Sequence, residues 1–182
     1  MTDPLGQSQV IPYLIGLTKK GYSFTLISCE KEEVFAKNKE LIKSILDEHK
    51  IDWQPISYTK KPPILSTVFD VYRIKKLAFK LQQSKQFKIV HCRSYIAAMI
   101  GLQMKYTFQT KFIFDMRGFW ADERVDGKLW NLKNPLYRMV YNYFKKKEKQ
   151  FLENADYTIS LTQNAKVEML SWKHITNNPI KI

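Results

Sequence analysis

Segments with helical periodicity alternate with short apolar segments along this 182-residue chain, and this alternation constrains its fold more than any other feature. Helices are predicted at 8–20, from Glu32, at 65–84 and 94–106, from Pro135, and at 163–172. Strands are predicted at 22–29, 52–58, 87–92, 111–115, 157–161 and 179–182. Alternating units of this length specify a parallel sheet with helices on both faces. The sequence therefore predicts the α/β class, as one Rossmann-like, doubly wound domain over residues 1–182.

Both ends of this pattern look incomplete. Gly6 precedes a helix that normally follows a strand, yet no apolar segment precedes Gly6, and the chain stops as the strand at 179–182 begins. In a doubly wound sheet the first strand is central. We therefore expect truncation at both ends and a missing first strand. The strands at 22–29 and 87–92 should then either pair directly or accept a strand from elsewhere.

The cysteine pattern and the start of the chain favour a cytoplasmic protein. Two cysteines, Cys29 and Cys92, both close predicted strands, which suits a reducing compartment better than a disulfide framework. The first residues are neither basic nor apolar, as a signal peptide would be. No zinc-binding cysteine or histidine spacing occurs, so no metal site is predicted.

The formal net charge of +13 comes mostly from lysine, and the arginines are the more informative cations. Arg93, Arg117 and Arg124 all follow predicted strands. Arginine suits a fixed, bidentate grip on phosphate or carboxylate. The lysine-rich run at 145–149 is either a solvated helix face or a surface that favours an anionic membrane.

The stretch 114–124 combines acids, arginines and aromatic residues directly after a predicted buried strand. We expect it to be a loop at the carboxyl end of that strand, the edge of an α/β sheet where ligands bind. Asp115, Asp122 and Glu123 could supply a general base there. The alternative is a salt-bridged lid without a binding role.

Two further segments carry candidate site residues. His91 ends a strand, where a histidine could hydrogen-bond a substrate or be a satisfied structural residue. Ser94 is expected to cap the next helix rather than act as a nucleophile. Gly6 heads a helix amino terminus that could meet a phosphate or a sugar hydroxyl. The chain has neither a GxGxxG motif nor a P-loop, which argues against dinucleotide binding and P-loop phosphoryl transfer.

Taken together, the segments 3–9, 91–94 and 117–124 resemble the amino-terminal domain of a bacterial glycosyltransferase of family 4, the group 1 transferases. The resemblance runs over practically the whole chain. It implies the amino-terminal, acceptor-binding half of a GT-B architecture, whose missing second half binds the nucleotide-sugar donor. The implied reaction is sugar transfer with retention to a glycan or lipid-linked acceptor, without a cofactor and usually without a metal. The 182 residues alone are then expected to bind acceptor weakly and not to catalyse transfer.

The resemblance also assigns roles by position. Gly6 matches a glycine-containing loop near the donor phosphates, and Arg117 stands where many members of the family have histidine. Arg117 could instead anchor an anionic group of the acceptor. The catalytic candidates are His91, Asp122 and Glu123. The substrate-binding candidates are Gly6, Gln7, Arg93, Ser94, Arg117, Trp120 and Arg124.

Two other functions compete with sugar transfer. One is a non-catalytic module that binds an anionic glycan or membrane surface. The other is nucleic-acid binding, which ranks last because the aromatic residues lie among acids rather than among the basic runs. No nucleic-acid partner is therefore expected.

Overall fold

A computed structural model describes residues 1–62, 65–172, 175 and 179–182, and it confirms the α/β class with parallel strands. The chain divides into two compact units, Met1–Ala78 and Phe79–Ile182, which we call the amino-terminal and carboxyl-terminal units. Each unit is described by itself. The single domain over 1–182 stays a prediction.

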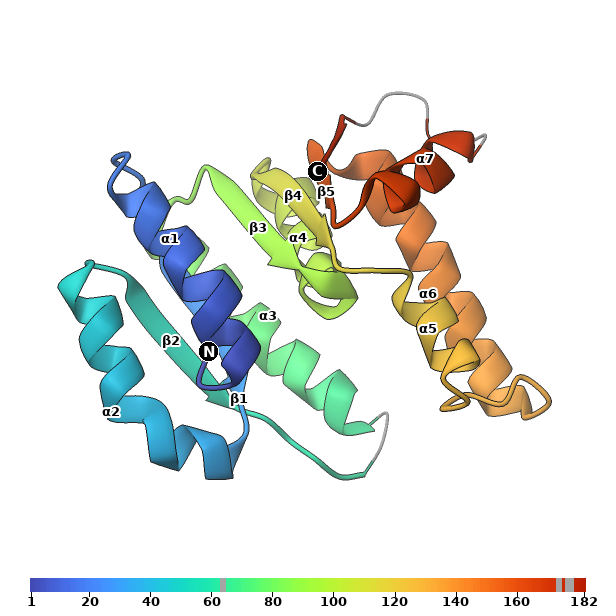
Figure 1. Cartoon of the computed structure of the whole chain (residues 1–182), viewed down its shortest axis with the longest axis horizontal. Coiled ribbons are helices and arrows are strands. Elements are labelled where there is room, and N and C mark those ends of the chain that lie inside the picture. The colour runs from blue at the N-terminus through green and yellow to red at the C-terminus, as the bar shows by residue number, and fades with distance from the viewer. Residues whose placement is uncertain (63–64, 173–174, 176–178) are drawn as a thin grey trace. The chain divides into compact units, whose positions relative to one another are not determined.

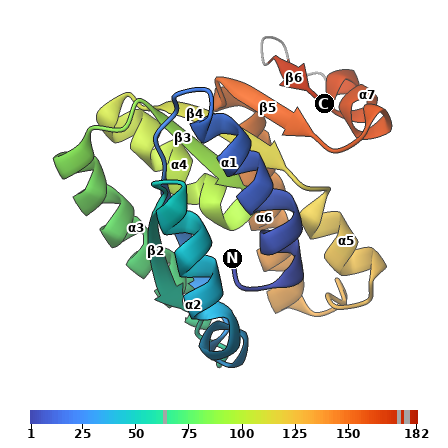
Figure 2. The ribbon, with the colours of Figure 1, turned by 60° about the vertical axis from the view of Figure 1, so that its left-hand side comes forward.

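The amino-terminal unit contains a two-stranded parallel sheet. Its elements are η1 (Gly6–Val10), α1 (Ile11–Thr18), β1 (Thr25–Glu30), α2 (Glu32–Glu48), β2 (Asp52–Ser57) and most of α3 (Leu65–Lys85). β1 and β2 pair in parallel from Thr25 opposite Asp52 to Glu30 opposite Ser57. Figure 2 shows α2 lying along β2. Ile42 and Leu46 of α2 pack with residues of α1 in the core of this unit.

The carboxyl-terminal unit contains a four-stranded parallel sheet in the order β3-β4-β5-β6 (Figure 1). Its elements after α3 are β3 (Ile89–Arg93), α4 (Ser94–Phe108), β4 (Lys111–Met116), α5 (Trp120–Asp126), α6 (Pro135–Asn154), β5 (Tyr157–Ser160), α7 (Gln163–Ser171) and β6 (Ile180–Lys181). Every pair of neighbouring strands is parallel. The carboxyl ends of these strands therefore meet at one edge of the sheet.

The core of this unit lies between one face of the sheet and helices α4 and α6. Phe112, Phe114 and Met116 alternate along β4 and are buried, as the period of a strand requires when one face is covered. They share a core with Tyr95 of α4 and Phe151 of α6.

Gly101 allows α4 to lie close to the strands. A Cβ at this position would lie 2.3 Å from Cys92 Sγ and 2.9 Å from the ring of Phe112. Any side chain there would therefore push the helix away from the sheet.

In the described residues β1 pairs with β2, and β3 pairs with β4. The alternatives for the strands at 22–29 and 87–92 concern a contact between the two units, so they stay predictions.

The structure corrects two expectations. First, the loop expected over 114–124 is confined to 117–119, because Asp122 and Glu123 lie in the first turn of α5, where acids stabilise a helix. Second, the helix at Ser94 has no side-chain cap, and Ser94 itself adopts a left-handed φ of 71°.

The run at 145–149 also differs from a simple solvated face. Glu148 is buried, with 1% of its surface exposed, because it follows Phe144 and precedes Leu152 on the inward face of α6. Across the described ranges, no helix combines the length and the apolar character needed to cross a membrane.

Candidate ligand site at the carboxyl ends of the strands

Three cationic or potentially cationic side chains surround Asp115 at the end of β4. The parallel register places Arg93 directly beside Asp115, and His91 lies two residues earlier on the same face of β3. The Asp115 Oδ2 atom lies 3.6 Å from His91 Nε2 and 4.0 Å from Arg93 Nη1. Its Oδ1 atom lies 3.6 Å from Arg117 Nη1. The sequence-predicted residues His91, Arg93 and Arg117 are therefore brought together around one carboxylate.

Asp115 is 6% exposed, so its charge is largely removed from water. A buried carboxylate is strongly unfavourable unless cations compensate it. The distances to its neighbours are those of ion pairs rather than of direct hydrogen bonds, and Oδ1 has no hydrogen-bond partner among the described residues. Asp115 therefore orients this group of side chains by electrostatic attraction.

A hollow of about 500 Å³ lies next to this cluster, where β4 and β5 end and α7 begins. Its walls combine charged, polar and apolar side chains. They are Met116, Arg117, Gly118, Phe119, Glu123, Ser160, Leu161, Thr162, Asn164, Ala165, Glu168 and Met169. A concave site with a few placed polar groups among apolar ones is typical of small-ligand binding.

Arg117 and Glu123 are the sequence-predicted residues on the wall of this hollow. Gly118 between them has a φ of 142°, and a Cβ there would lie 2.0 Å from Glu123 Oε1. Glycine is therefore required for the Glu123 side chain to fold back over the loop. None of the described residues forms a hydrogen bond or ion pair with the Glu123 carboxylate, which is exposed.

Asp122 is turned towards α6 instead. It accepts hydrogen bonds from Tyr141 Oη at 2.7 Å and from Lys145 Nζ at 2.8 Å. The hydrogen bond to Asp122 raises the pKa of Tyr141. Asp122 therefore fixes α5 on α6, and it does not line the hollow.

A partly buried chain of polar contacts continues from Asp122 to α6 and α4. Lys145 also donates to Glu148, and Glu148 accepts a hydrogen bond from Tyr95 Oη. Burial, together with the Glu148 charge, raises the pKa of Tyr95. Burial by itself lowers the pKa of Lys145, but its hydrogen bonds to Asp122 and Glu148 outweigh this effect and raise it. These contacts hold α4, α5 and α6 together under the loop that carries Arg117.

Sequence reasoning missed Glu148 as part of this support. The signal was present, because Glu148 lies four residues after Phe144 and four before Leu152, on the apolar stripe of the helix. The surrounding lysines concealed it. The same reasoning missed Tyr95, whose hydroxyl could not be paired with α6 from the sequence.

Trp120 and Arg124 lie on α5 and pack against each other. The Trp120 ring makes edge contacts with Trp130 and Phe144, and the Arg124 guanidinium lies 4.9 Å from its centroid. Such a stack is worth about 0.5–1 kcal/mol or more when it is partly desolvated. In the described structure both residues therefore contribute to packing beside the loop, and neither lines the hollow.

The remaining candidates lie elsewhere. Gly6 and Gln7 belong to the amino-terminal unit. The Gly6 amide donates to Asp3 Oδ1 at 2.8 Å, and a Cβ at Gly6 would lie 2.7 Å from backbone atoms of Met1. The Gln7 side chain donates to the Thr2 carbonyl at 2.7 Å. Both residues thus have local structural partners.

The described part of the chain contains no group of three or more histidine, cysteine, aspartate or glutamate side chains placed to hold a metal ion. The chemistry available at the hollow is therefore that of a guanidinium, which can bind an anionic group, and of a carboxylate, which can accept a hydrogen bond from a hydroxyl. Comparisons of the chain with protein-family models, with curated proteins and with solved structures found no match.

Proposed function

We propose that this chain is the acceptor-binding part of a retaining glycosyltransferase that transfers a sugar from a nucleotide-sugar donor to a glycan or lipid-linked acceptor. The resemblance of segments 3–9, 91–94 and 117–124 to family 4 transferases suggests the reaction class. The observation that carries the proposal is the hollow at the carboxyl ends of β4 and β5, with Arg117 and Glu123 on its wall.

The acceptor in this proposal carries an anionic group. The Arg117 guanidinium binds that group, and the apolar side chains Phe119 and Leu161 contact the body of the sugar. Glu123 accepts a hydrogen bond from the acceptor hydroxyl and orients it for attack on the donor. Asp115 holds Arg117 in place by its charge, and His91 and Arg93 complete that cluster.

The cellular setting is part of the same proposal. A lipid-linked acceptor would place the protein in the cytoplasm, at the inner face of the membrane. In the described structure Lys147 and Lys149 make contacts within α6, with Gln150 and Glu153. The membrane contact is therefore assigned to the acceptor lipid rather than to this lysine run.

Sugar transfer is tested with the product of the whole reading frame that encodes this chain. Arg117→Ala and Glu123→Ala should each lower kcat/KM by at least about tenfold, which corresponds to about 1.4 kcal/mol of lost transition-state stabilisation. Arg138→Ala is the matched control, because Arg138 lies on α6 and its Nε donates to the Leu132 carbonyl at 2.9 Å, away from the hollow. Unchanged transfer in both variants would remove these residues from the mechanism.

Binding is tested separately on the 182-residue chain with glucuronate as an anionic sugar probe and glucose as the neutral comparison. Glucuronate should shift the amide signals of residues 116–119 and 160–165 in a nitrogen–proton correlation spectrum, and Arg117→Ala should abolish the shifts. Glucuronate binding combined with no transfer by the whole gene product would favour the non-catalytic glycan-binding module. If glucuronate does not bind at tens of millimolar, both the transferase hypothesis and the glycan-binding hypothesis are contradicted.

A further inference from the structure

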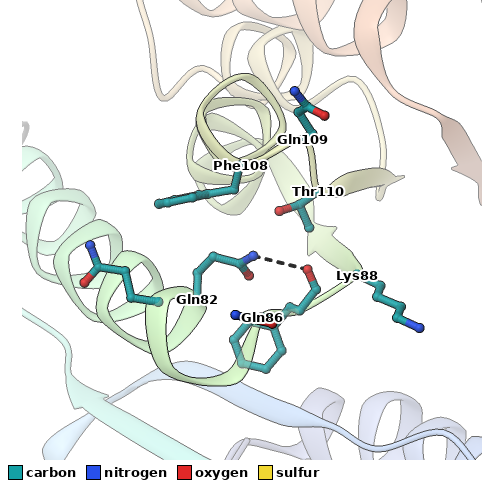
Figure 3. Close-up of a pocket in the computed structure, with 8 residues that line it drawn as sticks. Gln82, Gln86, Lys88, Phe108, Gln109 and Thr110 are labelled. Atoms are coloured by element: carbon teal, nitrogen blue, oxygen red, sulfur yellow. Dashed lines mark hydrogen bonds between the residues drawn. The ribbon is translucent and has the colours of Figure 1, made fainter.

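A second hollow, of about 590 Å³, lies at the opposite ends of the strands in the carboxyl-terminal unit (Figure 3). Its walls come from the segments that lead into β3 and β4. They are Gln82, Gln83, Gln86, Phe87, Lys88, Phe108, Gln109 and Thr110. The two hollows share no lining residue, so they are separate.

Two buried oxygen atoms in this wall lack hydrogen-bond partners among the described residues. They are Gln82 Oε1 and Thr110 Oγ1, and the two residues are 8% and 2% exposed. The Gln82 Nε2 atom donates to the Phe87 carbonyl at 3.3 Å, which fixes the orientation of the amide. Figure 3 shows the ends of Gln82 and Thr110 directed towards one another across the hollow. Buried polar atoms of this kind are rare in native proteins and call for a partner.

Two of the glutamines occupy positions that favour another residue. Gln86 follows α3 with a φ of 52°, and Gln109 follows α4 with a φ of 56°. Glycine is the usual residue in this left-handed conformation at the end of a helix, since a side chain is disfavoured there. Both positions nevertheless hold a long amide side chain that lines the same hollow.

An aromatic surface completes the wall. The Phe108 ring is held by an edge-to-face contact with Phe79, with 5.0 Å between the ring centroids. Phe87 lines the hollow as well. An aromatic ring fixed in this way offers an apolar face to a ligand at little cost in conformational entropy.

The charge of the wall limits the chemistry of the ligand. The eight lining residues include one cation, Lys88, and no carboxylate. A cationic ligand would lack a counter-charge, and an anionic one would meet mainly amide and hydroxyl oxygens and aromatic rings. The unpartnered oxygens require a hydrogen-bond donor, and the amides provide both donors and acceptors. Neutral hydroxyl groups on a compact body with an apolar face meet all these requirements.

We propose that this hollow binds a neutral saccharide. Both oxygens are closed off in the conformation described, so the Gln82 and Thr110 side chains rotate towards the hollow when the ligand binds. Two hydroxyl groups of the saccharide then donate to Gln82 Oε1 and Thr110 Oγ1, and its apolar ring face lies against Phe108. The remaining glutamine amides contact the outer hydroxyls. This site is distinct from the acceptor hollow, and it does not depend on the proposed transferase function.

The test is a titration of the 182-residue chain with maltose, cellobiose and N-acetylglucosamine at tens of millimolar, followed by amide nitrogen–proton correlation spectra. At least one of these saccharides should shift the signals of residues 82–88 and 108–110. Glycerol at the same concentration is the control for non-specific hydroxyl binding. If none of the three saccharides shifts these signals more than glycerol does, the proposal is wrong.

The Thr110→Val variant tests whether the buried Thr110 hydroxyl contacts the ligand. Valine has nearly the shape of threonine but cannot hydrogen-bond, so the variant should weaken saccharide binding by at least about tenfold while it remains folded. Thr107→Val is the matched control, because Thr107 is exposed near the end of α4, three residues before Thr110, and does not line the hollow. Equal binding by wild type and Thr110→Val would overturn the proposal. Should Thr110→Val fail to fold, Gln82→Met tests the second unpartnered oxygen in the same way.

Discussion

The two ends of the parallel strands in the carboxyl-terminal unit carry different chemistry. At the carboxyl ends, Arg117 and Glu123 line a charged hollow beside the buried carboxylate of Asp115. At the amino ends, the second hollow is lined mainly by amides and aromatic rings, with two buried oxygens that lack partners. At the first end, His91, Arg93 and Arg117 surround the charge of Asp115, whereas at the second end Gln82 Oε1 and Thr110 Oγ1 have no partner among the described residues.

This difference predicts opposite effects of mutation on stability. Removal of a charge from the network at the carboxyl ends takes a partner away from the charges around it and should destabilise the fold. Removal of an unpartnered oxygen at the amino ends relieves an unfavourable burial, so it should leave stability unchanged or raise it. The variants below test this contrast from the largest expected effect to the smallest.

Glu148→Ala should have the largest effect. It removes the partner of both Tyr95 and Lys145 in a position that is 1% exposed. Breaking a buried pair in this way costs about 3–5 kcal/mol. The free energy of unfolding is measured by urea denaturation followed by circular dichroism. Glu153→Ala is the control on the same helix, because its pair with the exposed Lys149 is worth less than about 1 kcal/mol. If both variants lose the same free energy of unfolding, Glu148 does not hold the helices together as described.

Asp115→Ala should come next. The variant leaves His91, Arg93 and Arg117 without the carboxylate that they surround, and we expect a loss of about 2–3 kcal/mol. It should also weaken glucuronate binding, since Arg117 is no longer held beside the hollow. Asp126→Ala, at an exposed position at the end of α5, should change neither quantity. A stable Asp115→Ala variant with normal glucuronate binding would show that the cluster has no positioning role.

Asp156 lies near the amino ends of the strands, outside the second hollow, and its charge is paired with Lys105 and Lys111. A substitution of Asp156 tests whether this pairing stabilises the fold. Burial alone would raise its pKa, but hydrogen bonds from Lys105, the Phe112 amide and Lys111 lower it to about 2. Because the folded pKa lies below the unfolded value, this stabilisation is complete above the ordinary pKa of aspartate and is lost as the pH falls to about 2. Asp156→Asn should therefore destabilise the chain by about 1–3 kcal/mol at neutral pH. The difference from wild type should shrink in acid, and a difference that is constant with pH would contradict this assignment.

The smallest effect, and the only gain, is expected from Gln86→Gly and Gln109→Gly. Each replaces a side chain at a positive φ, so each should raise the free energy of unfolding by about 0.5–1 kcal/mol. The same variants should weaken saccharide binding at the second hollow. A loss of stability would show that the glutamine side chains make contacts that hold the fold together.

Much of the fold could be predicted from the sequence, because the period of apolar residues changes clearly between helices and strands. The helices that begin at Glu32, Leu65 and Pro135 were placed almost to the residue. The short helix α5 was missed, since its polar and aromatic residues suggested a loop. Which strands lie next to one another depends on long-range contacts that local patterns do not contain.

The site was only partly predictable. Strand ends identified His91, Arg93 and Arg117 as site candidates, and the parallel strands bring their carboxyl ends together. The direction of the Asp122 side chain depends on Tyr141 and Lys145, which lie on α6, about twenty residues further along the chain. The second hollow could not be found, since glutamines have no reactive signature and their burial is a property of the packed structure.

The most direct test of the difference between the two ends is a competition titration of the wild-type chain. Glucuronate is titrated with and without a saturating concentration of the saccharide that shifts residues 82–88. We predict that glucuronate shifts residues 116–119 and 160–165 with the same affinity in both cases. Loss of these shifts in the presence of the neutral saccharide, or movement of one set of residues by both ligands, would contradict the assignment of two chemically distinct sites.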